Sequence, residues 1–136
     1  MMVARERKLP RPTTAELEIL QVLWERGTCT VRDVHEVLHR HDGTGYTTAL
    51  KQLQIMFDKG LVERDESQRA HVYRAAVSKE RTQKKFLSDM LQRVFEGSAS
   101  QLMMHALAGH RASSHEIEEL RRVLDAYRED DDDGAE

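Results

Sequence analysis

Hydrophobic residues recur at helical spacing in three consecutive segments of the N-terminal half, at about residues 13–26, 30–42 and 46–59. The first two segments begin with capping-box patterns at Thr13 and Thr30, in which the threonine oxygen accepts a hydrogen bond from an early helix amide. A glycine follows each segment, and glycine commonly ends a helix. The pattern predicts three short helices joined by tight connections.

After the third segment the period changes from helical to alternating. The runs LVERD (61–65) and HVYRA (71–75) favour β-strands, and the polar link ESQRA between them has hairpin length. Three helices followed at once by a hairpin have the layout of a winged helix-turn-helix. We therefore predict a mainly α fold with a small β wing. Residues 13–77 form this winged helix domain, and residues 1–12, basic and broken by proline, form a flexible arm.

The second half of the chain, residues 78–128, returns to helical periodicity with apolar stripes that are too sparse to close a core of their own. Such stripes are most economically buried against a second copy of the chain, so we predict a dimerisation region; packing against the N-terminal domain is the alternative. The acidic end EDDDDGAE (129–136) is expected to be a disordered tail. The predicted interface residues are Phe86, Met90, Leu91, Val94, Phe95, Leu102, Met103, Leu107, Ile117, Leu120 and Leu124.

Composition permits this interpretation without proving it. The formal net charge is −3, and charged residues make up 33% of the chain. Residues 1–77 are nearly neutral, and most of the excess acidity lies in the C-terminal half. A near-neutral winged domain also suits a protein-interaction adaptor. Cys29 is the only cysteine and no apolar run reaches the length of a membrane span, so we expect a cytoplasmic protein without membrane insertion.

The third predicted helix separates its side chains into two faces. Ala49, Leu50, Leu53, Met56 and Phe57 fall on the side expected to pack inward. The outward face consists of short hydroxyls, an amide, a cation and one β-branched residue, which are groups that contact base edges, phosphates and thymine methyls. A solvated surface helix is the alternative, against which the following wing argues. The candidate DNA-binding residues are Tyr46, Thr47, Thr48, Lys51, Gln52 and Ile55 on this helix, and Arg64, Arg69, His71 and Arg74 on the wing.

A short motif, His35-Glu36-Val37-Leu38-His39, matches the H-E-x-x-H pattern of zinc peptidases. A peptidase also needs a third zinc ligand and a cleft that excludes water. The extended form of the motif requires glycine at 42 and histidine at 45, where this chain has Asp42 and Gly45. We expect no catalytic residues, no metal and no cofactor. A zinc-dependent peptidase and a metal-responsive regulator stay open as alternatives.

Four stretches, PTTAELEILQVLWERGTCTVRDVHEVL, GYTTALKQLQIMFDKGLVERD, RAHVYRA and FEGSASQLMMHAL, resemble the penicillinase-repressor family of BlaI/MecI/CopY-type regulators. The resemblance covers roughly residues 9–127. It implies a homodimeric winged-helix repressor that binds inverted-repeat operator DNA, often with TACA/TGTA cores. The family's recognition positions fall on the outward face described above, where Lys51 replaces a frequent threonine and Ile55 a frequent arginine.

The resemblance also implies how repression ends. In lactam-responsive members a membrane sensor-protease system leads to cleavage of an Asn-Phe bond in the dimerisation region. The matching bond here is His105–Ala106, which keeps neither residue. Copper-responsive members carry paired C-terminal cysteines, whereas this chain has only Cys29. Release by proteolysis is therefore the expected mechanism.

Overall fold

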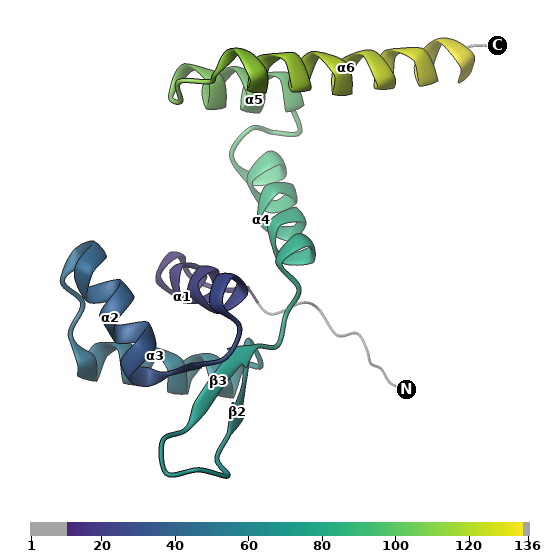
Figure 1. The fold of residues 1–136 in the computed structure, drawn as a ribbon. Helices are drawn as coiled ribbons and strands as arrows, with labels where there is room; N and C mark the ends of the chain where they lie inside the picture. The colour runs from purple at the N-terminus through teal and green to yellow at the C-terminus, as the bar shows by residue number, and fades with distance from the viewer. Residues whose placement is uncertain (1–10, 135–136) are drawn as a thin grey trace, which may run out of the picture. The chain divides into compact units, whose positions relative to one another are not determined.

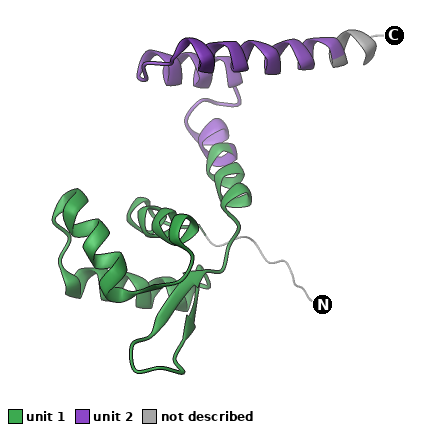
Figure 2. Cartoon of the chain, in the orientation of Figure 1, with its two compact units in different colours: residues 1–87 green, residues 88–136 purple. Residues whose placement is uncertain are grey.

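A computed structural model describes residues 11–134, with side chains described through Glu129. The predicted arm at 1–12 therefore falls almost entirely outside the described residues. The chain divides into two compact units, residues 1–87 and 88–136 (Figure 2). In the part of the chain that the structure describes, no helix is both long and apolar enough to cross a membrane.

The first unit is a winged helix-turn-helix, as the sequence predicts (Figure 1). Its three helices all start within a residue or two of the predicted positions, and the wing follows the third helix directly. The elements in order are α1 (Thr14–Arg26), β1 (Cys29–Thr30), α2 (Val31–Asp42), α3 (Tyr46–Lys59), β2 (Val62–Asp65) and β3 (Val72–Ala75), followed by the start of α4 (Lys79–Arg93).

Local capping fixes the helix ends. Thr13 Oγ1 accepts a hydrogen bond from the Glu16 amide at 3.1 Å, and Glu16 Oε1 accepts one from the Thr13 amide at 2.9 Å. Thr30 and Asp33 form the same reciprocal pair at the start of α2. At the other end of α3, Gly60 takes a left-handed conformation, φ 83°, which glycine adopts without steric cost. The predicted helix boundaries are confirmed because these signals are local.

The sheet contains one strand more than the predicted hairpin. Its order is β1-β3-β2, with all neighbours antiparallel. The added strand, β1, pairs Cys29 with Tyr73 and Thr30 with Val72. A strand of two residues is too short to show an alternation of polar and apolar residues in the sequence. Only its pairing with a distant strand defines this element.

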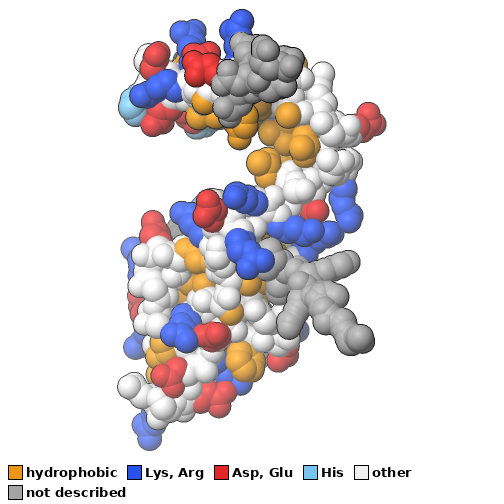
Figure 3. All heavy atoms as spheres, turned by 90° about the vertical axis from the view of Figure 1, so that its right-hand side faces the viewer, with side chains coloured by type: hydrophobic (Ala, Val, Ile, Leu, Met, Phe, Trp, Pro, Cys, Tyr) orange, Lys and Arg blue, Asp and Glu red, His pale blue; other side chains and the backbone are white. Residues whose placement is uncertain are grey.

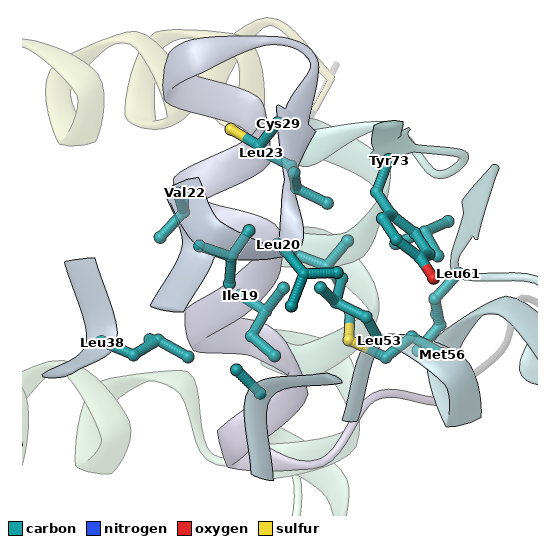
Figure 4. Packing of buried hydrophobic residues seen from close by; sticks show 14 residues of the cluster. Ile19, Leu20, Val22, Leu23, Cys29, Leu38, Leu53, Met56, Leu61 and Tyr73 are labelled. Carbon is teal, nitrogen blue, oxygen red and sulfur yellow. The ribbon is translucent and has the colours of Figure 1, made fainter. Parts of the chain in front are cut away.

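The core of the winged unit is built from all three helices and all three strands (Figure 4). Ile19, Leu20 and Leu23 of α1 meet Leu53 and Met56 of α3, and each of these side chains is at most 2% exposed. Tyr73 of β3 closes the core on the wing side and is 1% exposed. The helix–turn–helix and the wing therefore share a single core.

The second unit comprises the end of α4, α5 (Ala99–Ala108) and α6 (Ser114–Gly134). None of its described side chains, residues 88–129, is buried. Two details differ from the sequence prediction. Val94 and Phe95 lie in the turn after α4 rather than on the helix. Helix α6 also continues through Gly134, where a disordered tail was predicted from residue 129, because extending an existing helix is cheaper than starting one.

Candidate nucleic-acid interface

The two faces of α3 separate as the sequence predicts. Ala49, Leu53 and Met56 are fully buried against the rest of the winged unit. Thr47, Thr48 and Lys51 are exposed on the other side with Tyr46 and Ile55, and Gln52 is half-buried. Ile55 is 39% exposed, an apolar side chain in the middle of a polar face. A helix that closes the core with one face thus presents hydrogen-bonding groups with the other.

The start of α3 offers free backbone amides. Gly45 occupies the N-cap position and supplies no side-chain cap. The first amides of such a helix lack intrahelical partners, and the helix dipole favours an anion there. Tyr46 follows directly, 49% exposed, with its ring edge-on to His35 at a centroid distance of 5.6 Å. The helix start is therefore suited to a phosphate group.

On the wing, Arg64 is already held from several sides. Its Nη2 lies 2.6 Å from Glu66 Oε2, and its guanidinium carbon lies 4.0 Å from the centroid of the Phe57 ring. The side chain of Tyr73, and after it the Glu66 carboxylate, raise the pKa of the Arg64 guanidinium further above its usual value. Arg64 thus forms part of the wing's own structure in the free protein.

Arg74 forms a different pair on the same hairpin. Its Nη2 lies 2.6 Å from Oε1 of Glu63, its cross-strand neighbour, and both side chains are more than half exposed. Successive side chains on a strand point to opposite faces of the sheet, so Arg74 points away from buried Tyr73. Of the other predicted wing residues, Arg64 borders the same pocket as Arg74, whereas Arg69 and His71 do not.

Those other wing residues line an open groove of about 870 Å³ within the winged unit. The groove runs between the wing, α3 and the first turn of α2. Its charged and polar lining includes Arg64, Glu66, Arg69 and His71 from the wing, Tyr46 and Gln54 from α3, and Arg32 from α2.

Sequence reasoning missed Arg32 and Gln54. Gln54 follows Tyr46 and Leu50 at intervals of four, so a helical wheel could have placed it beside Tyr46. Arg32 carries no comparable signal, because only the folding of the wing brings the start of α2 to the groove.

The H-E-x-x-H histidines lie on α2 as a neighbouring pair with tilted rings. The ring centroids of His35 and His39 are 5.3 Å apart, and His39 Nδ1 lies 3.3 Å from the carbonyl oxygen of Thr44. Within the described residues, no group of three or more histidine, cysteine, aspartate or glutamate side chains could hold a metal ion. Cys29 is buried, and that burial, with a smaller contribution from Asp33, raises the pKa of its thiol.

The predicted interface residues of the second half are only partly covered within a single chain. Met90, Val94, Leu107 and Leu124 are 43–66% exposed. Figure 3 shows hydrophobic side chains open to view on these helices. The other predicted residues are half-buried: Phe86, Leu91, Phe95, Leu102, Met103, Ile117 and Leu120. His105 and Ala106, at the predicted cleavage site, are exposed within α5.

Comparison with known proteins agrees with these features. The family model described as penicillinase repressor matches residues 12–126. The transcriptional regulator BlaI of Mycobacterium tuberculosis is 31% identical over 119 residues, covering 86% of this chain and 85% of that protein. The penicillinase repressor of Bacillus licheniformis is 22% identical over 90% of this chain and 95% of its own length. A solution structure of the DNA-binding domain of the repressor BlaI is 23% identical and covers 54% of this chain and 90% of that one, with a TM-score of 0.49.

The family match spans both units of the chain, and the mycobacterial regulator exceeds 30% identity over most of it. The chain belongs to the penicillinase repressor family of DNA-binding transcriptional regulators.

Proposed function

We propose that the protein is a homodimeric, cytoplasmic repressor that binds an inverted-repeat operator by placing α3 of each protomer in a major groove. The single observation that carries the proposal is the division of α3. Its buried face fixes the helix to the core, and its other face carries exposed Thr48 and Lys51 and half-buried Gln52. A rigidly mounted polar helix face is what reading base edges requires.

The side chains divide by the chemistry that they offer. Thr48 and Gln52 would donate and accept hydrogen bonds at base edges, and Ile55 would contact a thymine methyl or a sugar. Thr47, Tyr46 and the free amides at the helix start would bind a phosphate. Lys51 would add a cation to the same face. Base contacts would then determine sequence preference, and phosphate contacts would determine position and affinity.

Dimerisation follows from the apolar surface of the second unit. Its described helices carry large apolar side chains and bury none of them, and such surface is stabilised by a second copy of the chain. A two-fold dimer would place two α3 helices on half-sites about one DNA turn, roughly 10 bp, apart. An inverted repeat is the operator that this symmetry requires.

Release by proteolysis would act on α5. The His105–Ala106 bond lies inside a helix, and cleavage needs the chain to unwind locally. Among the described residues of this unit no side chain is buried, which favours such opening. Cleavage there would separate α6 from the rest of the dimerisation region, and a membrane sensor-protease system would supply the signal. Mass spectrometry of the chain recovered from induced cells would locate the cut; an intact chain under induction contradicts this mechanism.

A gel-shift titration on inverted-repeat DNA tests the central proposal. With about four phosphates per protomer, the slope of log affinity against log salt should be about −7 for the dimer. Gln52→Ala should reduce discrimination between operator and mismatched DNA by about 1–3 kcal/mol. Gln21→Ala, an exposed glutamine on α1, is the matched control and should change neither quantity. Absence of retardation at low salt would refute the proposal.

A further inference from the structure

The groove between α3 and the wing has a charge distribution that the proposed recognition helix does not use. Three arginines line it, Arg32, Arg64 and Arg69, together with one carboxylate, Glu66. Without counting His71 the lining carries a net charge of +2. Residues 1–77 are almost neutral as a whole, so this is a local concentration of positive charge.

Two of these cations are available to a ligand. Arg32 and Arg69 are exposed, and neither forms an ion pair or hydrogen bond with the described part of the chain. The third is different, because Glu66 already neutralises Arg64. Both Nε and Nη2 of Arg64 lie 2.6 Å from one oxygen of Glu66.

We propose that the groove receives one sugar–phosphate strand of the operator and that Glu66 competes with the phosphate for Arg64. The inference rests on the proposed function and deepens it. In the free protein Glu66 would hold Arg64 against the Phe57 ring in the position that a phosphate can use. On binding, a phosphate oxygen would replace the carboxylate, and Glu66 would turn into solvent.

Exposure makes this exchange inexpensive. The Glu66 side chain is 50% exposed, so the carboxylate regains water when it leaves Arg64. A partly exposed ion pair contributes little to stability, whereas arginine binds phosphate in a favourable two-pronged geometry. Stacking on Phe57 is a second contact of Arg64, and it would help to keep the guanidinium in place during the exchange.

The composition of the groove favours a nucleic-acid strand over a small effector molecule. Small-molecule pockets are enclosed and mostly apolar, with few polar groups. This groove is open and lined by arginines from two separate elements, as an extended anion requires. It is also continuous with the proposed interface through Tyr46, which lines the groove and starts α3. Gln54, one helical turn after Leu50, would form a hydrogen bond with the same DNA strand.

The wing provides a matched control for the competitor role. Glu63 pairs with Arg74 at 2.6 Å, just as Glu66 pairs with Arg64, but neither Glu63 nor Arg74 lines the groove. Glu66→Gln and Glu63→Gln therefore remove the same charge from the same hairpin. Only the first frees an arginine where the strand would lie.

The experiment compares operator binding of the full chain and of these two variants across a salt series. Glu66→Gln should bind about three- to tenfold more tightly at low salt, because no carboxylate has to leave Arg64. Its salt slope should stay close to that of the unchanged protein, because Arg64 would meet a phosphate in both complexes. Glu63→Gln should stay within about twofold of the unchanged protein. Arg32→Ala should weaken binding to all sequences alike and flatten the slope by about 2 for the dimer, because each protomer loses one phosphate contact.

Several results would overturn the inference. Equal tightening by both glutamate variants would mean that only net charge matters. Unchanged or weaker binding by Glu66→Gln would remove the competitor role. Full affinity in the Arg32→Ala and Arg69→Ala variants would show that the DNA strand does not lie in the groove. In each case the unchanged protein still binds its operator, which distinguishes these failures from failure of the proposed function, in which the unchanged protein would not bind either.

Discussion

The two units of the chain solve the problem of burying apolar side chains in opposite ways. The winged unit closes a core of fourteen buried hydrophobic residues within about fifty-five positions, from Ile19 to Tyr73. The described helices beyond residue 87 leave Leu107, Val123 and Leu124 roughly half exposed and bury nothing. The winged unit buries its apolar side chains within a single chain. The second unit leaves them exposed, as one side of a protein–protein interface does before its partner binds.

Under the proposed function, this difference would suit the two units to separate roles. DNA reading needs side chains held in fixed positions, and a closed core supplies that rigidity to α3. Dimerisation and release need a region that is stable in the dimer and that opens locally when the dimer dissociates. A regulator of this type gains from having its reading unit independent of its assembly state. The comparison can be tested by making the same change in both units.

The largest effect should come from removing a core leucine of α3. Leu53 is fully buried, so Leu53→Ala should lower the free energy of unfolding of the winged unit by about 2–5 kcal/mol. The single tryptophan, Trp24 in α1, reports on this unit alone, so its fluorescence during urea unfolding measures the change.

The matched change is Leu124→Ala in α6, where the side chain is 51% exposed. It should leave the Trp24 transition almost unchanged, within about 0.5 kcal/mol. It should instead weaken self-association in sedimentation equilibrium. Equal shifts of the Trp24 transition by both variants would show that the two units fold as one, and the comparison would fail.

How much of this could be read from the sequence depends on whether the signal was local. The capping pairs at Thr13 and Thr30 each span three residues, so the helix starts were predictable. Strand β1 and the position of Arg32 beside the wing depend on pairing between Thr30 and Val72, some forty residues apart. No spacing in the sequence encodes that pairing.

The candidate site divides in the same way. The outward face of α3 follows from helical geometry, so a wheel predicted most of it from the sequence alone. Exposed Gln54 was missed, and Gln52 is half-buried rather than exposed. The engagement of Arg64 with Glu66 and Phe57 could not be predicted, because it depends on side-chain conformations across the hairpin and α3. The four predicted wing residues therefore looked equivalent, whereas two of them, Arg64 and Arg74, are ion-paired.

A smaller effect should come from the buried carboxylate of α1. Glu16 is 3% exposed and accepts hydrogen bonds from the Thr13 amide and, at 2.6 Å, from Lys59 Nζ at the end of α3. Glu16→Gln keeps the capping box but loses the charge opposite Lys59, which is one-third exposed and partly screened by solvent. The winged unit should lose about 1–2 kcal/mol. Glu18→Gln, half-buried on the same helix, should cost less than half as much by the same Trp24 measurement; equal losses would mean that the Lys59 contact adds nothing.

A still smaller loss is expected where the wing leads into α4. The Trp24 indole Nε1 donates a hydrogen bond of 3.0 Å to the Val77 carbonyl. Trp24→Phe keeps an aromatic ring and removes the donor, so the cost should be about 1 kcal/mol. Calorimetry should show the winged unit melting about 4–8 °C lower. An unchanged melting temperature would mean that water replaces the indole without loss.

The smallest expected effect lies in the second unit and has the opposite sign. Glu96 follows α4 with φ 54°, a left-handed conformation that costs a side-chain-bearing residue about 1 kcal/mol. Glu96→Gly removes this strain but increases the freedom of the unfolded chain, so the net gain should be a few tenths of a kcal/mol.

The control for this prediction is the neighbouring residue Gly97, which has φ 84°. A methyl group there would meet only Gln92 Oε1 at 3.9 Å, so Gly97→Ala should cost about 1 kcal/mol through backbone strain alone. Far-ultraviolet circular dichroism should show these opposite shifts in helix melting while the Trp24 transition stays fixed, because both residues belong to the unit without a core. Movement of the Trp24 transition by either variant would show that the turn after α4 also supports the winged unit.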